Sequence, residues 1–144
     1  MPFQPRKVLL GAFSVAFFLL LCQIARMIFQ KGAESVCNSG GAFGVDISAG
    51  ILFGATLGIL VLFGVQWWRE EEPSLVWAWV ILFSGGLSNF LERVSSGCVV
   101  DYISLGWFPA FNVADILLTI GVIGVLVRIY LIKQVVHDSI KTQN

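Results

Sequence analysis

The sequence predicts an all-α membrane protein in which four transmembrane helices carry a small extracytoplasmic β element, and two observations lead to this fold class. Of the 144 residues, 57% are hydrophobic and 12% are charged, whereas soluble domains carry about 25% charged residues. The apolar residues also gather into long runs, which indicates that lipid is their solvent. We therefore expect residues 1–144 to form a single membrane domain.

Four apolar segments are long enough to cross a bilayer, which takes about 20 residues of helix. They cover residues 8–29, 49–66, 75–91 and 111–132. Helices are expected rather than barrel strands, because the runs lack alternation between polar and apolar residues. The run before Cys22 is similar to a removable signal, but large leucines stand where a cleavage site needs small residues. Since the apolar run continues to Phe29, we expect a retained helix.

Basic residues predict the orientation of the spans, because Lys and Arg concentrate in cytoplasmic loops. They stand before the first span, in the second connection and after the last span: Arg6, Lys7, Arg69, Lys133 and Lys141. Both termini and the second connection are therefore expected in the cytoplasm. Arg128, near the inner end of the last span, is expected to reach the cytoplasmic headgroups. Nine basic and nine acidic residues cancel, which leaves no net field to attract nucleic acid.

The two connections expected outside the membrane carry the β element. Residues 36–45 combine Asn, Ser and Gly, which predicts turns beside a short strand. Residues 99–105 alternate and are β-branched, which predicts a strand near the membrane surface. Cys37 and Cys98 lie on the same side, so a bridge between them is possible, but sequence cannot place their backbones and the pairing stays open. The polar tail after Lys133 is expected to fray.

Polar residues at the start of the last span are the first candidates for chemistry, because ionisable and amide groups at membrane depth are costly. Asn112, Asp115 and Thr119 are spaced three and four residues apart, so they share one helix face. The dipole at a helix N-terminus favours a carboxylate there. An N-terminal cap would explain Asn112 or Asp115 taken singly, and it explains the two together less well.

Asp101 is the second acid and lies among apolar residues of the predicted strand. Taken alone, it is explained equally well as an exposed strand residue. Fourteen residues along the chain lead from Asp101 to Asp115, and such a connection can fold back to bring the two acids together. Two carboxyls that share a site do not both ionise easily, so one can act as base for water and the other as acid for the scissile amide. The pair predicts peptide hydrolysis.

The end of the third span carries another polar face, formed by Asn89, Glu92 and Arg93. A helix end at the interface with a local Glu92 ion pair is a fair alternative to a functional site. Small residues that let helices approach closely stand on the second and third spans: Gly50, Gly54, Gly58, Gly85 and Gly86. The sequence has no HExxH metal signature, and we expect neither a metal nor a cofactor.

Together these segments resemble the lipoprotein signal peptidase family, also called signal peptidase II, over most of the chain. Residues 38–44 resemble the family's N-x-G-x-A-[FW]-[GS] block, and residues 89–93 its G-N-x-x-D-R block. Residues 99–103 resemble V-V-D-F-I, and residues 111–115 resemble F-N-x-A-D. The order of these blocks among four spans is the specific part of the resemblance.

The resemblance implies an aspartyl endopeptidase of the bacterial inner membrane. Such an enzyme cuts signal peptides from diacylglyceryl-modified prolipoproteins, before the lipidated cysteine. The catalytic pair would be Asp101 and Asp115. Positions that hold the substrate or neighbouring residues would be Asn38, Gly40, Phe43, Asn89, Arg93 and Asn112. The implied partners are the lipid-modified prolipoprotein, the bilayer and globomycin-like inhibitors, without nucleic acid.

The first-span block departs from the family's D-Q-x-[ST]-K pattern. It has Cys22 where the family has an acid, and it keeps a basic end at Arg26, which is expected to snorkel to the outer surface. Glu92 stands where the family has Asp. A divergent active enzyme is our first hypothesis. A catalytically silent relative and a small membrane binding or scaffold protein are the alternatives.

Overall fold

The computed structural model of the chain describes residues 5–30, 35–40 and 48–141. Its helices are α1 (Pro5–Phe29), α2 (Ala49–Arg69), α3 (Pro73–Ser96) and α4 (Val113–Lys141). Each contains a stretch long and apolar enough to cross a membrane. Two short strands, β1 (Val36–Asn38) and β2 (Val99–Asp101), form an antiparallel pair. The predicted class of four membrane helices with a small β element is confirmed.

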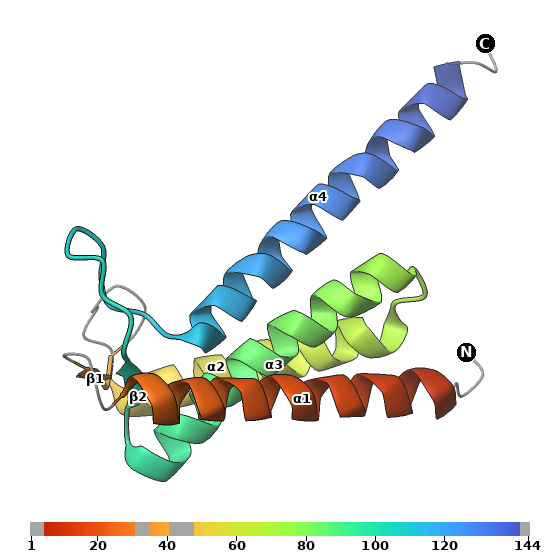
Figure 1. The fold of residues 1–144 in the computed structure, drawn as a ribbon. Helices are drawn as coiled ribbons and strands as arrows, with labels where there is room; N and C mark the ends of the chain where they lie inside the picture. The colour runs from red at the N-terminus through yellow and green to blue at the C-terminus, as the bar shows by residue number, and fades with distance from the viewer. Residues whose placement is uncertain (1–4, 31–34, 41–47, 142–144) are drawn as a thin grey trace.

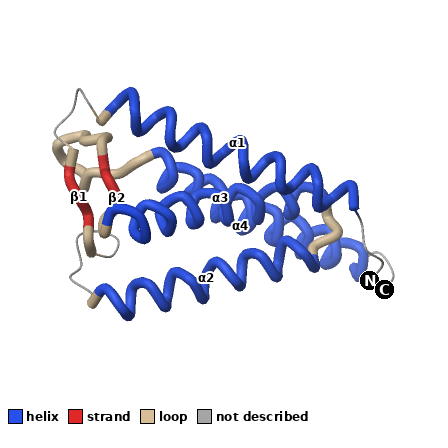
Figure 2. The backbone as a smooth tube through the Cα atoms, turned by 90° about the horizontal axis from the view of Figure 1, so that it is seen from below, coloured by secondary structure: helices blue, strands red, loops and turns tan. Residues whose placement is uncertain are grey.

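Helix α3 is the centre of the bundle and packs against the other three helices. The β pair lies at one end, whereas both termini and the turn between α2 and α3 lie at the other (Figures 1 and 2). Lys7 joins α1 to that turn, because its Nζ donates to the Trp68 carbonyl at 3.1 Å and also to the Glu70 carbonyl. Outward faces are apolar, as lipid contact requires; Phe13, for example, is 72% exposed.

Helices α3 and α4 approach closely because glycines stand at their contact. A Cβ on Gly85 would lie 2.6 Å from the Ala114 carbonyl oxygen, and one on Gly121 would lie 2.5 Å from Leu82 Cγ. Leu82 also packs with Val125 in a buried cluster between the two helices. The expectation of close packing at Gly85 is therefore confirmed.

Two expectations about the spans are corrected. The glycine ridge of α2 does not pack, since a Cβ on Gly50, Gly54 or Gly58 would meet no described atom within 4 Å. Helix α4 continues to Lys141 because the polar tail contains neither Pro nor Gly to stop it. At the same end of the bundle as the turn between α2 and α3, Arg128 Nη2 donates to Glu72 Oε1 at 2.7 Å.

The β pair is joined by a disulfide, a pairing that the sequence had left open. Gly97, with φ of 77°, ends α3 in the left-handed region and turns the chain into β2. The antiparallel register sets Cys37 opposite Val100, and Cys37 bonds to Cys98 across a Cα–Cα distance of 5.6 Å. The second strand is also shorter than predicted, because pairing beyond β2 resumes only at an isolated bridge between Ile103 and Phe111.

Candidate active site

Asp115 enters the site from the first turn of α4, where two reciprocal hydrogen bonds start the helix. Asn112 Oδ1 accepts from the Asp115 backbone N–H, and Asp115 Oδ2 accepts from the Asn112 backbone N–H, each at 3.1 Å. This is a capping box, so a cap explains the two residues together better than expected. The cap uses only one carboxylate oxygen, however. The other, Oδ1, accepts from Asn89 Nδ2 at 2.8 Å.

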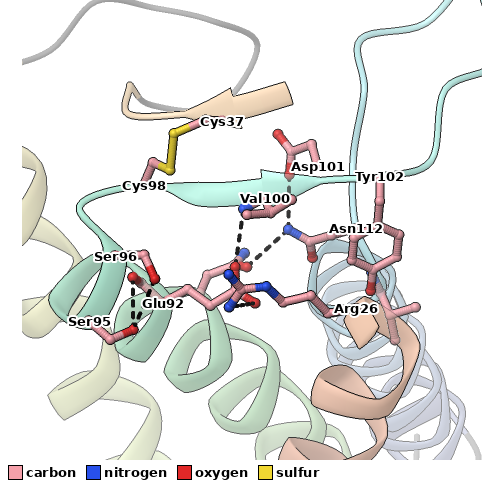
Figure 3. A network of polar contacts seen from close by, with 12 residues as sticks. Arg26, Cys37, Glu92, Ser95, Ser96, Cys98, Val100, Asp101, Tyr102 and Asn112 are labelled. Atoms are coloured by element: carbon pink, nitrogen blue, oxygen red, sulfur yellow. Dashed lines mark hydrogen bonds and ion pairs between the residues drawn. A yellow bond between two sulfur atoms is a disulfide. The ribbon is translucent and has the colours of Figure 1, made fainter. Parts of the chain in front are cut away.

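Asp101 lies at the end of β2 and is almost fully enclosed, with 4% of its surface exposed. The alternative of an exposed strand residue is therefore wrong. Asn38 Nδ2 donates to Asp101 Oδ2 at 3.0 Å, and Asn112 Nδ2 donates to Oδ1 at 3.0 Å. Each carboxylate oxygen thus has an amide donor. Figure 3 shows Asn112 reaching from the start of α4 toward Asp101.

Two asparagines connect the acids. The Asn112 amide that donates to Asp101 also donates to Asn89 Oδ1 at 3.2 Å, and Asn89 in turn donates to Asp115. A continuous series of side-chain hydrogen bonds therefore joins the two carboxyls. Amide side chains supply both donors and acceptors without titrating, so they hold the carboxyls in place without adding charge.

The surroundings of Asp101 raise the pKa of its carboxyl above the ordinary value of 3.8. Burial is the largest cause, because it disfavours the charged form, and the negative charge of Asp115 acts in the same direction. Hydrogen bonds from Asn38 and Asn112 and the positive charge of Arg93 oppose the rise without cancelling it. The site therefore favours a protonated Asp101 more than water does.

Both acids line one cavity of about 700 Å³. Most of its wall is apolar and comes from α2, α3, α4 and the connection before α4, including Leu52, Ile59, Phe63, Phe111, Ile116 and Ile120. The polar residues Asn38, Asn89 and Arg93 line it together with the acids. An apolar cavity with a few convergent polar groups is the usual form of a ligand site.

The other predicted site residues in the described ranges fall around the acid pair. The Gly40 N–H donates to Asn38 Oδ1 at 3.1 Å, and Arg93 Nη2 donates to the Gly40 carbonyl at 3.2 Å. The first bond is local to the turn after β1, and the second holds that turn against α3. The structure thus brings together Asn38, Gly40, Asn89, Arg93 and Asn112 with the two acids, and Phe43 lies outside the described residues.

Arg26 and the buried Glu92 form an ion pair that the sequence reasoning missed. Arg26 Nη1 lies 3.6 Å from Glu92 Oε1, with 20% and 7% of the side chains exposed, so Arg26 points into the bundle instead of snorkelling. Glu92 Oε2 accepts from the Val100 backbone N–H at 3.1 Å. Because Val100 precedes Asp101, the pair fastens the acid-bearing strand to α1 and α3 (Figure 3). The sequence signal that could have found this pair is the position of Arg26 near the end of α1 and of Glu92, with opposite charge, near the end of α3.

Cys22, where the resemblance expects an acid, is 3% exposed and packs against Ala114 and Leu117 of α4. It behaves as a small apolar residue. The basic residue of the same block keeps a partner, since Glu92 supplies the negative charge for Arg26.

The fold and the cavity describe a multi-pass membrane protein with a site for a partly apolar ligand. Residues 8–131 match the signal peptidase (SPase) II family. The lipoprotein signal peptidase of Syntrophomonas wolfei is 35% identical over 130 residues, which cover 86% of this chain and 87% of that protein. The chain therefore belongs to the signal peptidase II family, whose members remove signal peptides from prolipoproteins, and it is a bacterial membrane peptidase.

Other similarities agree with this assignment. The lipoprotein signal peptidase of Streptococcus pneumoniae is 38% identical over 96 residues, which cover 62% of this chain and 62% of that protein. A bacterial membrane enzyme solved by the in meso method at 2.3 Å resolution superposes with a TM-score of 0.74 at 28% identity. That superposition covers 83% of this chain and 87% of the other.

Proposed function

We propose that this chain is an aspartic endopeptidase that removes signal peptides from diacylglyceryl-modified prolipoproteins, with Asp101 and Asp115 as its catalytic residues. One observation carries the proposal: the two acids line a single cavity and are linked by hydrogen bonds through Asn112 and Asn89. Peptide hydrolysis needs a base and an acid on either side of one amide, and a linked pair of carboxyls supplies both.

In the proposed mechanism the two acids share one proton. Burial and the charge of Asp115 raise the pKa of Asp101, which favours a pair in which one carboxyl is protonated and the other ionised. The ionised carboxyl takes a proton from a water molecule as the water oxygen attacks the scissile carbonyl carbon. The protonated carboxyl donates to the carbonyl oxygen, which leaves a tetrahedral carbon carrying two hydroxyls. The carboxyl that took the proton from water then gives it to the leaving nitrogen as the C–N bond breaks, and the other carboxyl takes a proton from one hydroxyl as the C=O bond re-forms.

The cavity suits a substrate that is itself embedded in lipid. Its apolar wall between α2 and α4 can pack against the hydrophobic part of a signal peptide or against acyl chains. Asn38, Asn89 and Arg93 at the acid end provide donors for the peptide backbone beside the scissile bond. We infer that globomycin-like inhibitors compete for the same end of the cavity.

The acid pair faces the outside of the cell in this proposal, and both termini are cytoplasmic. Basic residues gather at the end of the bundle that holds the termini, as in cytoplasmic loops. The disulfide between Cys37 and Cys98 lies at the opposite end, and disulfides persist in oxidising compartments. A green fluorescent protein fused to the C-terminus should therefore fluoresce, whereas an exported alkaline phosphatase fused there should be inactive.

The test of the substrate is a cleavage assay with purified chain in lipid vesicles. Diacylglyceryl-modified prolipoprotein should be cut immediately before its lipidated cysteine, as read from the mass of the product, and globomycin should block the cut. The unmodified precursor is the matched control and should be cut far more slowly. Equal cleavage of both precursors would show that the lipid is not part of what is recognised.

A further inference from the structure

We propose that the disulfide between Cys37 and Cys98 positions Asn38 on Asp101, so that cleavage depends on this covalent bond being intact. The two cysteines are positioning residues and do not touch the substrate. The inference rests on the proposed function, because Asp101 is assigned there as a catalytic residue.

The bond lies next to the residue that it would position. Cys37 immediately precedes Asn38 on β1, and Cys98 immediately precedes β2, which ends in Asp101. In the register of the pair, Asn38 is opposite Val99. Figure 3 shows the disulfide bridging β1 and the start of the β2 ribbon, with Asp101 farther along that ribbon. Because Cys37 and Asn38 are adjacent in β1, a displacement of Cys37 also displaces Asn38.

The remaining contacts between β1 and the rest of the described structure are few and non-covalent. Each strand has three residues, and an isolated two-stranded pair is only marginally stable in water. Beyond that pairing, Asn38 donates to Asp101 and Arg93 donates to the Gly40 carbonyl. The disulfide joins positions that are 61 residues apart, so it removes much of the chain entropy that would otherwise separate the strands.

Losing the bond has a specific consequence at Asp101. The charged groups around this carboxyl are Asp115 from α4 and Arg93 from α3, and Glu92 with its partner Arg26 lies beneath the neighbouring Val100. Of these groups, Arg93 also donates to the Gly40 carbonyl just after β1, whereas Asp115, Glu92 and Arg26 are positioned by their own helices. The Asn38 amide is positioned by β1, and it favours the ionised form of Asp101. Displacing it should move the pH profile of cleavage to higher pH, a change that a loss of overall stability would not produce.

The experiment compares rates before and after reduction. A dithiol such as dithiothreitol gives two electrons and two protons to the bond; the S–S bond breaks, two cysteine thiols form, and the dithiol becomes a cyclic disulfide. In vesicles holding the full chain, we expect kcat/KM for diacylated prolipoprotein to fall about tenfold, the effect of losing a hydrogen bond to a charged group. Alkylation followed by mass measurement confirms how much of the bond is open.

Three variants identify where the effect acts. The double variant Cys37→Ser/Cys98→Ser should have the lowered rate with and without reductant. Asn38→Ala should already be lowered, with its profile at higher pH, and reduction should lower it no further. Cys22→Ala, which removes the free buried thiol, should match the native chain in both conditions.

Each outcome decides the matter. A native chain that keeps its rate after the bond is shown to be open overturns the inference and leaves the proposed function standing. If reduction lowers Asn38→Ala as much as the native chain, the bond acts through something other than Asn38, and the positioning role is wrong. An oxidised native chain that cuts no prolipoprotein removes the proposed function, and the inference with it.

Discussion

Replacing Gly85 by alanine tests whether the contact between α3 and α4 sets the position of Asp115. Gly85 faces the carbonyl of Ala114, the residue before Asp115, and an added Cβ would lie 2.6 Å from that oxygen. Ordinary contact begins at 3.4 Å, so the first turn of α4 must move by about 0.8 Å. Overpacking of this kind costs about 1–3 kcal/mol of stability, and a misplacement of about 1 Å in an active site can lower a rate about 100-fold.

We therefore expect Gly85→Ala to lower kcat/KM by about 10- to 100-fold in a gel-shift assay of prolipoprotein processing, while the chain still inserts into the membrane. Gly58→Ala in α2 is the matched control, because its Cβ would meet no described atom within 4 Å. Alanine is also the better helix former, by about 1 kcal/mol. A Gly85→Ala variant that cleaves at the native rate would refute the reasoning that this contact positions Asp115.

Three further changes probe the surroundings of the site. Asn112→Ser keeps a side-chain oxygen to cap α4 but loses the amide that donates to Asp101. We expect kcat/KM to fall about tenfold while thermal stability stays nearly unchanged. If activity and thermal stability fall together, Asn112 acts only as a helix cap. Arg26→Met leaves the buried Glu92 carboxylate without its ion-pair partner and should lower the free energy of unfolding by about 3 kcal/mol. The double variant Arg26→Met/Glu92→Gln should recover most of this loss. A single variant as stable as the native chain would contradict the prediction. Hydrogen bonds, first that from Arg128, lower the pKa of Glu72 from 4.5 to about 2. Because the pKa of Glu72 is lower in the folded chain than in the unfolded chain, its ionised carboxylate stabilises the fold above pH 4.5, and this stabilisation is lost as the pH falls from 4.5 to about 2. Glu72→Gln should therefore lower Tm at neutral pH but not near pH 2. A difference in Tm that stays constant across this pH range would argue against it.

Hydropathy and charge placement predicted the helices well, because a segment in lipid must satisfy its backbone groups within itself. The sequence also indicated that the candidate polar site residues gather at one end of the third and last spans. Asp101 and Asp115 could be paired in advance because the fourteen-residue connection between them can fold back, and because the family resemblance places a catalytic pair on these positions. Their actual link, through Asn112 and Asn89, depends on how α3 and α4 pack, which periodicity does not report.

Contacts between distant segments were the part that sequence reasoning could not predict. The disulfide at Cys37 follows from the register of two three-residue strands, and nothing in their composition sets that register. The pairing of Arg26 with Glu92 depends on the relative depth and rotation of two helices. The glycine ridge of α2 shows the converse error, since small residues permit close packing but do not require it.

The central claim is that Asp101 and Asp115 together hydrolyse the signal peptide bond. The most direct measurement is cleavage of diacylglyceryl-modified prolipoprotein by the native chain, Asp101→Asn and Asp115→Asn, at equal inserted amounts. Glu71→Gln, an exposed acid at the opposite end of the bundle, is the matched control. We predict native rates for the control and a fall of about a thousandfold in each Asp variant. Undiminished cleavage by both Asp variants would contradict the claim, and no cleavage by the native chain would identify a catalytically silent relative.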